Sequence, residues 1–228
     1  DSPDDWLLSN VENALFVFLA TEDYKDYYET EGFQGWIGIE PAKYMKLKTG
    51  FRYDNTHWLE ARRHLWSMFG RQKLFRENFS SVAEPYRNTG ISEIDSSKTG
   101  AIFINADYDT QYLGADSSFS GWSLAGEFEW SNSALASDYV YRRYSFSAIR
   151  YQYLNQSFSL RMRGKLANSD GYLPMYKRYF VGGFGTLPGY RHKEFIGTRY
   201  WMANSELLIK LPIAMKPKLI MVWDAAQI

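Results

Sequence analysis

The chain lacks cysteine, net charge and any long apolar run, and each absence excludes a class of protein. Without cysteine among its 228 residues, it has no disulfide scaffold, no thiolate metal site and no cysteine nucleophile. Its 26 basic and 26 acidic side chains balance, which excludes a generally basic nucleic-acid binder and a disordered polyelectrolyte. The longest unbroken apolar run covers residues 14–20, well short of the ~18 residues that a membrane-spanning helix needs.

Aromatic residues are abundant instead. The chain has 18 Tyr, 15 Phe and 8 Trp, together 18% of its residues, although its mean hydropathy is only −0.43. This aromatic content is high for a soluble surface, while the mean hydropathy resembles that of a soluble protein. A pattern that separates apolar from polar faces would reconcile the two values.

Several segments alternate between apolar and polar residues with period two, which predicts β-strands. The clearest lie at residues 45–54, 122–131, 157–166 and 201–211. In the second of these, one face carries Trp122, Leu124, Gly126, Phe128 and Trp130. Weaker alternation predicts further strands at residues 33–40, 101–109, 139–153 and 219–224.

The predicted strands are long. They run for about ten residues, against ~5–6 in a typical globular strand and ~9–11 in a tilted membrane-spanning strand. In lipid, every backbone polar group must be paired, so strands cross a membrane only as a closed barrel. Such strands alternate apolar-out and polar-in between aromatic girdles, as Trp122 and Trp130 would provide. A soluble sandwich or lipocalin-like barrel also alternates and remains an alternative.

Three segments do not look like strands. Residues 58–69 repeat apolar side chains at helical spacing before Gly70, which predicts a short helix within a loop. Residues 5–19 fit either a helix with a capping box or, at residues 14–20, a strand. Residues 71–99 are polar with scattered aromatics and are expected to form a long loop.

A glycine-rich segment near the C-terminus connects the chain to a known family. It reads Arg178-Tyr-Phe-Val-Gly-Gly-Phe-Gly-Thr-Leu-Pro-Gly-Tyr190, with Gly197 and Asn204-Ser-Glu-Leu207 downstream. Together with residues 107–110, Gly121-Trp122 and Asp224, this order resembles the BamA/TamA-type outer-membrane assembly superfamily, also called the bacterial surface antigen barrel. The resemblance extends from about residue 107 to residue 224.

The resemblance implies a loop that folds into the lumen of a barrel. Its expected motif comprises Gly182, Gly183, Gly189, Tyr190 and Arg191. In the family, an arginine of this loop pairs with carboxylates of the barrel wall, which here would be Glu206 and Asp224. This chain has Pro188 at the arginine position. Because a buried carboxylate needs a partner, we expect Arg191, or failing that Arg199, to meet these carboxylates.

No other group of residues indicates chemistry. The three histidines, His57, His64 and His192, lack the spacing of a metal site. The acidic run at residues 22–31 lacks the pattern of an EF-hand. Nucleophile-elbow, P-loop and dinucleotide motifs are absent. We therefore expect no catalytic residue, no metal and no cofactor.

Together these features predict an all-β fold, an antiparallel transmembrane β-barrel with a long inward-folding loop and a short loop helix. The whole chain (residues 1–228) is expected to form one domain that is incomplete at both ends, with about ten of the ~16 strands of the family's barrel. The resemblance implies a bacterial outer-membrane protein that inserts or translocates polypeptides. Its partners would be outer-membrane lipid, a polypeptide substrate or envelope-complex subunits, but no nucleic acid. The alternatives are a barrel that anchors or exports a passenger domain, a structural envelope subunit, and a soluble all-β sugar-binding protein.

Overall fold

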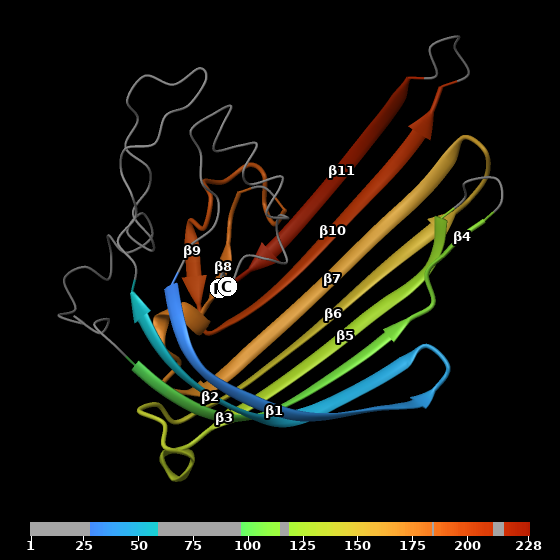
Figure 1. The fold of residues 1–228 in the computed structure, drawn as a ribbon. Helices are drawn as coiled ribbons and strands as arrows, with labels where there is room; N and C mark the ends of the chain where they lie inside the picture. Colours follow the sequence, from blue (N-terminus) through green and yellow to red (C-terminus); the bar gives the residue numbers. More distant parts are fainter. Residues whose placement is uncertain (1–27, 59–96, 115–118, 184, 212–216) are drawn as a thin grey trace, which may run out of the picture.

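The computed structural model describes residues 28–58, 97–114, 119–183, 185–211 and 217–228. Eight long strands form one antiparallel sheet (Figure 1). In sheet order they are β1 (Tyr28–Ala42), β2 (Met45–Trp58), β3 (Ser97–Asp109), β5 (Phe119–Ser131), β6 (Tyr141–Tyr153), β7 (Phe158–Gly171), β10 (Arg199–Lys210) and β11 (Lys218–Gln227). A two-residue strand, β4 (Tyr112–Leu113), adds to β5. Each of the eight strands predicted from period-two alternation is confirmed.

The alternation places apolar and polar side chains on opposite faces of the sheet. On β5, Trp122 is 43% exposed on the outer face, whereas Glu129 and Ser131, near the other end of the strand, face inward and are buried. The strands are 10 to 15 residues long, which suits a tilted membrane span. The low mean hydropathy thus results from averaging an apolar face with a polar one.

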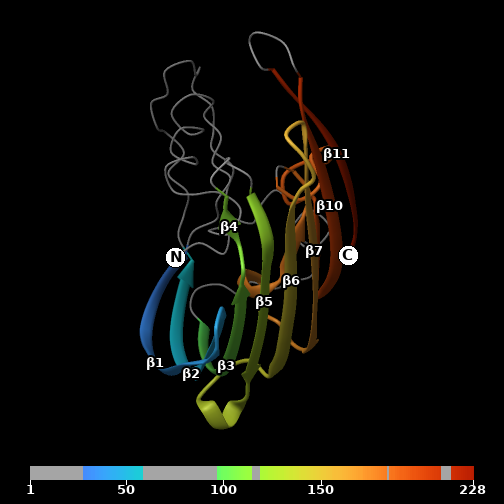
Figure 2. The ribbon, with the colours of Figure 1, turned by 90° about the vertical axis from the view of Figure 1, so that its right-hand side faces the viewer.

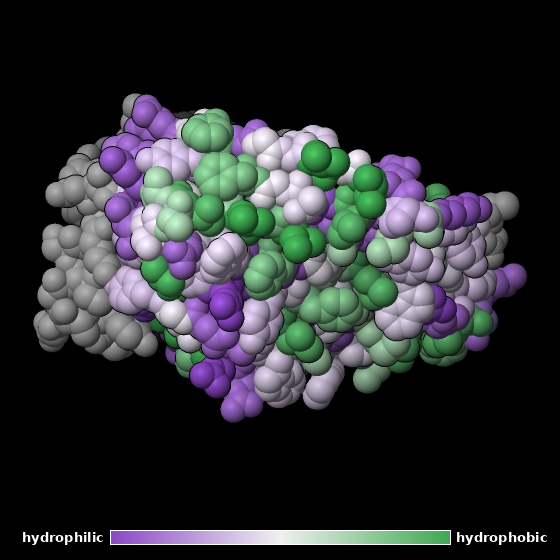
Figure 3. Space-filling view, turned by 90° about the horizontal axis from the view of Figure 1, so that it is seen from below, coloured by the Kyte–Doolittle hydropathy of each residue, from purple (hydrophilic) through white to green (hydrophobic). Residues whose placement is uncertain are grey.

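The sheet is strongly curved. Its strands follow one another around an arc from β1 to β11 (Figure 2). Apolar side chains gather into a band on the underside of the molecule (Figure 3). Large exposed apolar residues occur on every long strand, among them Ile37, Ile104, Phe146, Leu166, Trp201 and Trp223. An outward apolar belt of this kind is the lipid-facing surface of a membrane barrel.

The described strands do not close the barrel. β1 and β11 lie at the two ends of the sheet order and do not pair with one another within the described residues. The fold class is confirmed as an antiparallel barrel-type sheet. The expected strand count of about ten compares with the eight long strands that the described residues place in the arc.

The connections differ at the two ends of the strands. At one end, short turns join β1 to β2 and β6 to β7. At the other end, residues 172–198, called here the inward loop, join β7 to β10 and fold back over the concave face (Figure 1). The inward loop contains a 3₁₀ turn, η2 (Met175–Lys177), and a hairpin of β8 (Tyr179–Val181) and β9 (Phe195–Gly197). A second 3₁₀ turn, η1 (Ser133–Leu135), lies between β5 and β6.

The small buried core lies between the inward loop and the sheet. Tyr179 and Val181 of β8 pack against Ala167 of β7 and against Tyr200 and Met202 of β10. The described residues that cover the concave face belong to the inward loop and its short two-stranded sheet of β8 and β9, not to a second layer of long strands. The sandwich alternative therefore does not describe this fold.

Some predictions fall outside the described residues. These are the alternative helix or strand at residues 5–19, the loop helix apart from Trp58, and most of the loop at residues 71–99. Trp58 is the last residue of β2, and residues 97–99 are the first residues of β3 rather than loop. Within the described part of the chain, no helix is long and apolar enough to cross a membrane.

Candidate functional site: an inward loop held at two points

Glycines allow two segments of the inward loop to pass close to one another. Gly182 and Gly183 have φ angles of 125° and 80°, which side-chain-bearing residues rarely adopt. A Cβ at Gly182 would lie 2.5 Å from the backbone oxygen of Arg191, and one at Gly183 would lie 2.7 Å from the Cα of His192. These two glycines are therefore required where the outgoing and returning strands of the loop touch. Gly189 has open space around its Cα and no positive φ.

A buried carboxylate holds the start of the loop. Lys177 Nζ of η2 lies 2.5 Å from Glu129 Oε1 on β5. Arg52 of β2 reaches the other oxygen of Glu129 at 2.7 Å, and Tyr141 of β6 donates its hydroxyl to Glu129. We call these four residues the charged anchor. Lys177 and Glu129 are each 8% exposed. Because water hardly reaches them, each charge depends on the other for its stabilisation.

Tyr176 adds a neutral contact next to the charged anchor. Its hydroxyl lies 2.6 Å from Thr99 Oγ1 of β3, and its ring meets that of Tyr28 edge-on at 5.5 Å between centroids. Burial raises the pKa of Tyr176, so its hydroxyl stays protonated. Burial also lowers the pKa of Lys177 to about 8, although Glu129 opposes that shift, so Lys177 remains largely charged at neutral pH.

The tip of the loop is held at a second point on the other half of the sheet. Arg163 of β7 donates to the carbonyl oxygen of Gly185 and, through Nε, to Asn204 Oδ1 of β10 at 3.0 Å. Asn204 Nδ2 donates to Thr186 O at 3.0 Å and to Asp224 Oδ1 of β11 at 2.5 Å. We call Arg163, Gly185, Thr186, Asn204 and Asp224 the amide anchor. Its wall residues bind loop backbone rather than a loop side chain.

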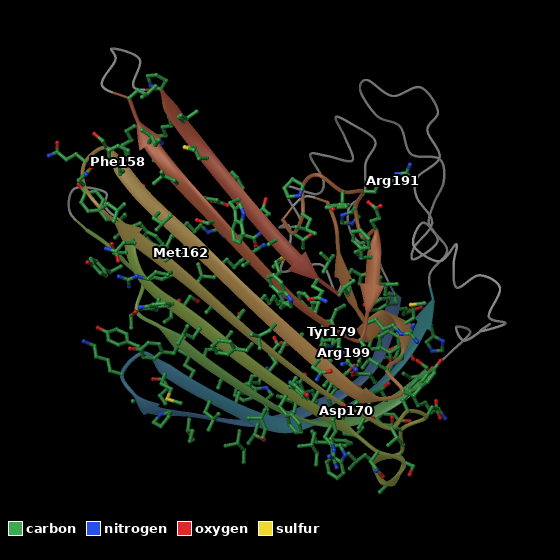
Figure 4. The ribbon with its side chains drawn as sticks, turned by 180° about the vertical axis from the view of Figure 1, so that it is seen from behind. Phe158, Met162, Asp170, Tyr179, Arg191 and Arg199 are labelled. Carbon is green, nitrogen blue, oxygen red and sulfur yellow. The ribbon has the colours of Figure 1, made fainter. Side chains whose placement is uncertain are left out.

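The expected partners of the wall carboxylates differ from those observed. Glu206 pairs with Arg161 Nη1 of β7 at 3.1 Å, and Asp224 accepts from Asn204. Arg191 is exposed on the loop (Figure 4), and its backbone N–H donates to Glu194. Arg199 is exposed on β10, on the face opposite to the buried Tyr200 (Figure 4). Within the described residues, neither arginine pairs with Glu206 or Asp224, so this expectation was wrong.

Residues 187–190 of the loop, which follow the segment held by the amide anchor, contribute little to the contact with the wall. Leu187 packs against the small core, but Pro188 and Gly189 are exposed. The Tyr190 ring meets Phe195 edge-on at 5.2 Å between centroids, which is a contact within the loop. The structure thus places the predicted motif residues in one loop without bringing Tyr190 or Arg191 to the wall carboxylates.

Sequence reasoning missed most residues of both anchors. Neither Glu129 nor Lys177 lies in a motif that marks it as a site residue in the sequence. Arg163 had a visible signal, because it lies in the inward-facing basic row Arg161, Arg163 and Lys165. Asn204 was part of the family motif, but its side-chain role required the register of β10 against β7 and β11.

Comparisons with known proteins identify the family. The model of the Omp85 superfamily domain matches residues 2–227. The chain belongs to the Omp85 superfamily. Its structure is similar to that of BamA from Haemophilus ducreyi lacking POTRA domains 1–3, with a TM-score of 0.58 at 17% sequence identity. The match covers 89% of this chain and 42% of the BamA chain, so this Omp85 chain spans less than half of that solved protein. No curated protein matches it significantly.

Within this Omp85 domain, the contacts of the site are ion pairs and hydrogen bonds. The described residues contain no group of three or more metal-ligating side chains. What the site can do is hold the inward loop against two separate parts of the sheet through charged and amide hydrogen bonds. Because the chain belongs to the Omp85 superfamily, its fold is an outer-membrane type of barrel and not that of a soluble sugar-binding protein.

Proposed function

We propose that this Omp85 domain assists the insertion or translocation of polypeptides at the bacterial outer membrane, where lipid surrounds its apolar face. The observation that carries the proposal is the inward loop, which is fixed to both halves of the sheet. The charged anchor holds it to β2, β5 and β6, and the amide anchor holds it to β7, β10 and β11. A loop held in this way fixes the curvature of the wall and limits the space within it.

The proposed roles follow from these contacts. Gly182 and Gly183 give the loop its close crossing, while Gly189, Tyr190 and Arg191 form its exposed tip, which a polypeptide or a complex partner can reach. Of the wall carboxylates, Asp224 supports the loop through Asn204. Glu206 acts on the wall itself through Arg161. Enzyme activity, a cofactor and nucleic-acid binding remain outside the proposal.

A second candidate function is a barrel that anchors or exports an attached domain, or a structural subunit of an envelope complex. It is favoured by Pro188, because this exposed residue cannot supply the cation that the family's loop carries at this position. The assignment of residues 1–228 to a single incomplete barrel domain is likewise a proposal. Under either function, that domain would complete its barrel with strands beyond the eight in the sheet.

Reconstitution tests the proposal. The protein encoded by the complete gene is placed in liposomes, and an unfolded outer-membrane β-barrel protein is added. We expect more protease-protected, folded substrate than with empty liposomes, and less with Glu129→Gln or Asn204→Ala. Arg142→Gln, which changes an exposed residue on the outer face of β6, is the matched control. If the wild-type protein folds no more substrate than empty liposomes, the anchoring or structural function is favoured instead.

A further inference from the structure

A cavity of about 440 Å³ lies between the inward loop and the concave face of the sheet. Its walls come from β1, β2, β5, β6, β7 and β10, and its cover comes from residues 176–193 of the loop. This volume lies within the range of ~300–1,000 Å³ typical of small-molecule sites. The two anchors flank the cavity, so the contacts that hold the loop also maintain this space.

The lining of the cavity is strongly basic although the chain as a whole is neutral. Two carboxylates line it, Asp54 and Glu127, and the carboxylate of Glu129 lies directly beneath Lys177. Six basic side chains line it: Arg52, Arg143, Lys165, Lys177, Arg178 and Lys193. Even with Glu129 included, cations exceed carboxylates by three in a space that is partly shielded from water.

Several of these cations are held in place by the fold. Arg143 Nε donates to the Tyr179 hydroxyl at 3.3 Å, which turns the guanidinium towards the loop. Lys193 is only 3% exposed, with its ammonium 4.8 Å from the centre of the Phe180 ring. Concentrating like charges in a poorly solvated space is unfavourable, and a bound anion relieves the repulsion. The excess of positive charge therefore indicates a binding site for an anion.

We propose that this cavity binds a phosphate group. The lining cations arise from separate elements, β2, β6, β7 and the loop, so they approach the space from several directions. A phosphate has more acceptor oxygens than a carboxylate for such converging donors, and arginine pairs with phosphate in a bidentate manner. Tyr200 also lines the cavity and brings a hydroxyl group of the kind that hydrogen-bonds to phosphate.

Calorimetric titration of the purified protein in neutral detergent micelles, with inorganic phosphate at low ionic strength, tests the proposal. We expect saturable binding that weakens by ~10-fold or more in Arg143→Gln, because a hydrogen bond to a charged group is lost. Arg142→Gln is the matched control, since Arg142 is the next residue on β6 and faces outward. Lys165→Gln should weaken binding in the same way, and Lys165→Arg should restore it.

The phosphate can come from solution or from a lipid headgroup, and a second titration with short-chain phosphatidic acid distinguishes the two. Binding of inorganic phosphate that depends on Arg143 and Lys165 supports the site with a soluble ligand. Lipid binding alone, with the same dependence, supports the site with a headgroup ligand. The proposal is overturned if neither probe binds, or if Arg142→Gln weakens binding as much as Arg143→Gln. Urea unfolding of each variant shows that a loss of binding is not a loss of fold.

Discussion

The two anchors of the inward loop use different chemistry. The charged anchor depends on a loop side chain, because Lys177 reaches the buried Glu129 on β5. The amide anchor depends on loop backbone, because Arg163 and Asn204 bind the carbonyl oxygens of Gly185 and Thr186. A substitution in the loop can therefore remove the first anchor, whereas only a substitution in the wall removes the second.

The amide anchor also bears on Pro188, the position at which the family resemblance leads us to expect an arginine. Where the family's loop offers a cation to a wall carboxylate, the wall of this chain offers Arg163 to the loop. Asp224 is then satisfied by Asn204, which also donates to the loop. The exposed residues Pro188 and Gly189 of the loop take no part in these contacts. The predictions that follow test whether the two anchors are independent.

The largest effect is expected from Glu129→Gln. It leaves Lys177 buried without a carboxylate, whereas Arg52 keeps its ion pair with Asp54 at 3.0 Å. Breaking a buried pair such as Lys177–Glu129 costs about 3–5 kcal/mol. Urea unfolding in detergent, followed by tryptophan fluorescence, measures the loss. Trypsin should also cut faster after Lys177 and Arg178. Glu127→Gln is the control, because Glu127 lies on the same face of β5 and its carboxylate meets Ser145 rather than a loop residue. Equal effects of the two variants would contradict the charged anchor.

Gly183→Ala should have the next largest effect. Its φ of 80° and the backbone 2.7 Å from the added methyl group make the substitution strained, at about 1–3 kcal/mol. Gly189→Ala is the matched control in the same loop, because the new methyl group meets no atom within 4 Å. Its expected effect is below ~0.5 kcal/mol. Urea unfolding compares the two variants. If Gly189→Ala is as destabilising as Gly183→Ala, the close contact between the two segments of the loop does not lie at Gly183.

The strands were predictable because their signal is local. Alternation over ten or more residues fixes which side chain of β5 or β7 faces inward, without knowledge of any other strand. The anchors were not predictable, because Lys177 and Glu129 are 48 residues apart and the loop that carries Lys177 could fold in many ways. The Arg161–Glu206 pair was easier to predict than the anchors but harder than the strands. The two residues are direct cross-strand neighbours, but their register depends on the path of residues 172–198.

Asn204→Ala should have a moderate and local effect. It removes the hydrogen bonds that Asn204 donates to Thr186 and Asp224 and the one that it accepts from Arg163, worth about 1–3 kcal/mol in total. Hydrogen exchange should accelerate in peptides covering residues 182–187 but not at residues 175–178, which the charged anchor holds. Asn168→Ala is the control, since Asn168 lies on the opposite face of β7 and donates to Tyr144. Faster exchange at both sites in Asn204→Ala would show that the two anchors release together.

The smallest effects concern the exposed wall pair. Arg161 and Glu206 form an ion pair at 3.1 Å with side chains 36% and 39% exposed, and such pairs contribute ~0.2–1 kcal/mol. A double-mutant cycle of Arg161→Ala with Glu206→Ala should give a coupling energy in that range, which decreases as salt is added. The cycle of Arg191→Ala with Glu206→Ala should be additive, because Arg191 does not contact Glu206 among the described residues. Coupling in the second cycle but not in the first would return the loop arginine to the role that the family motif assigns to it.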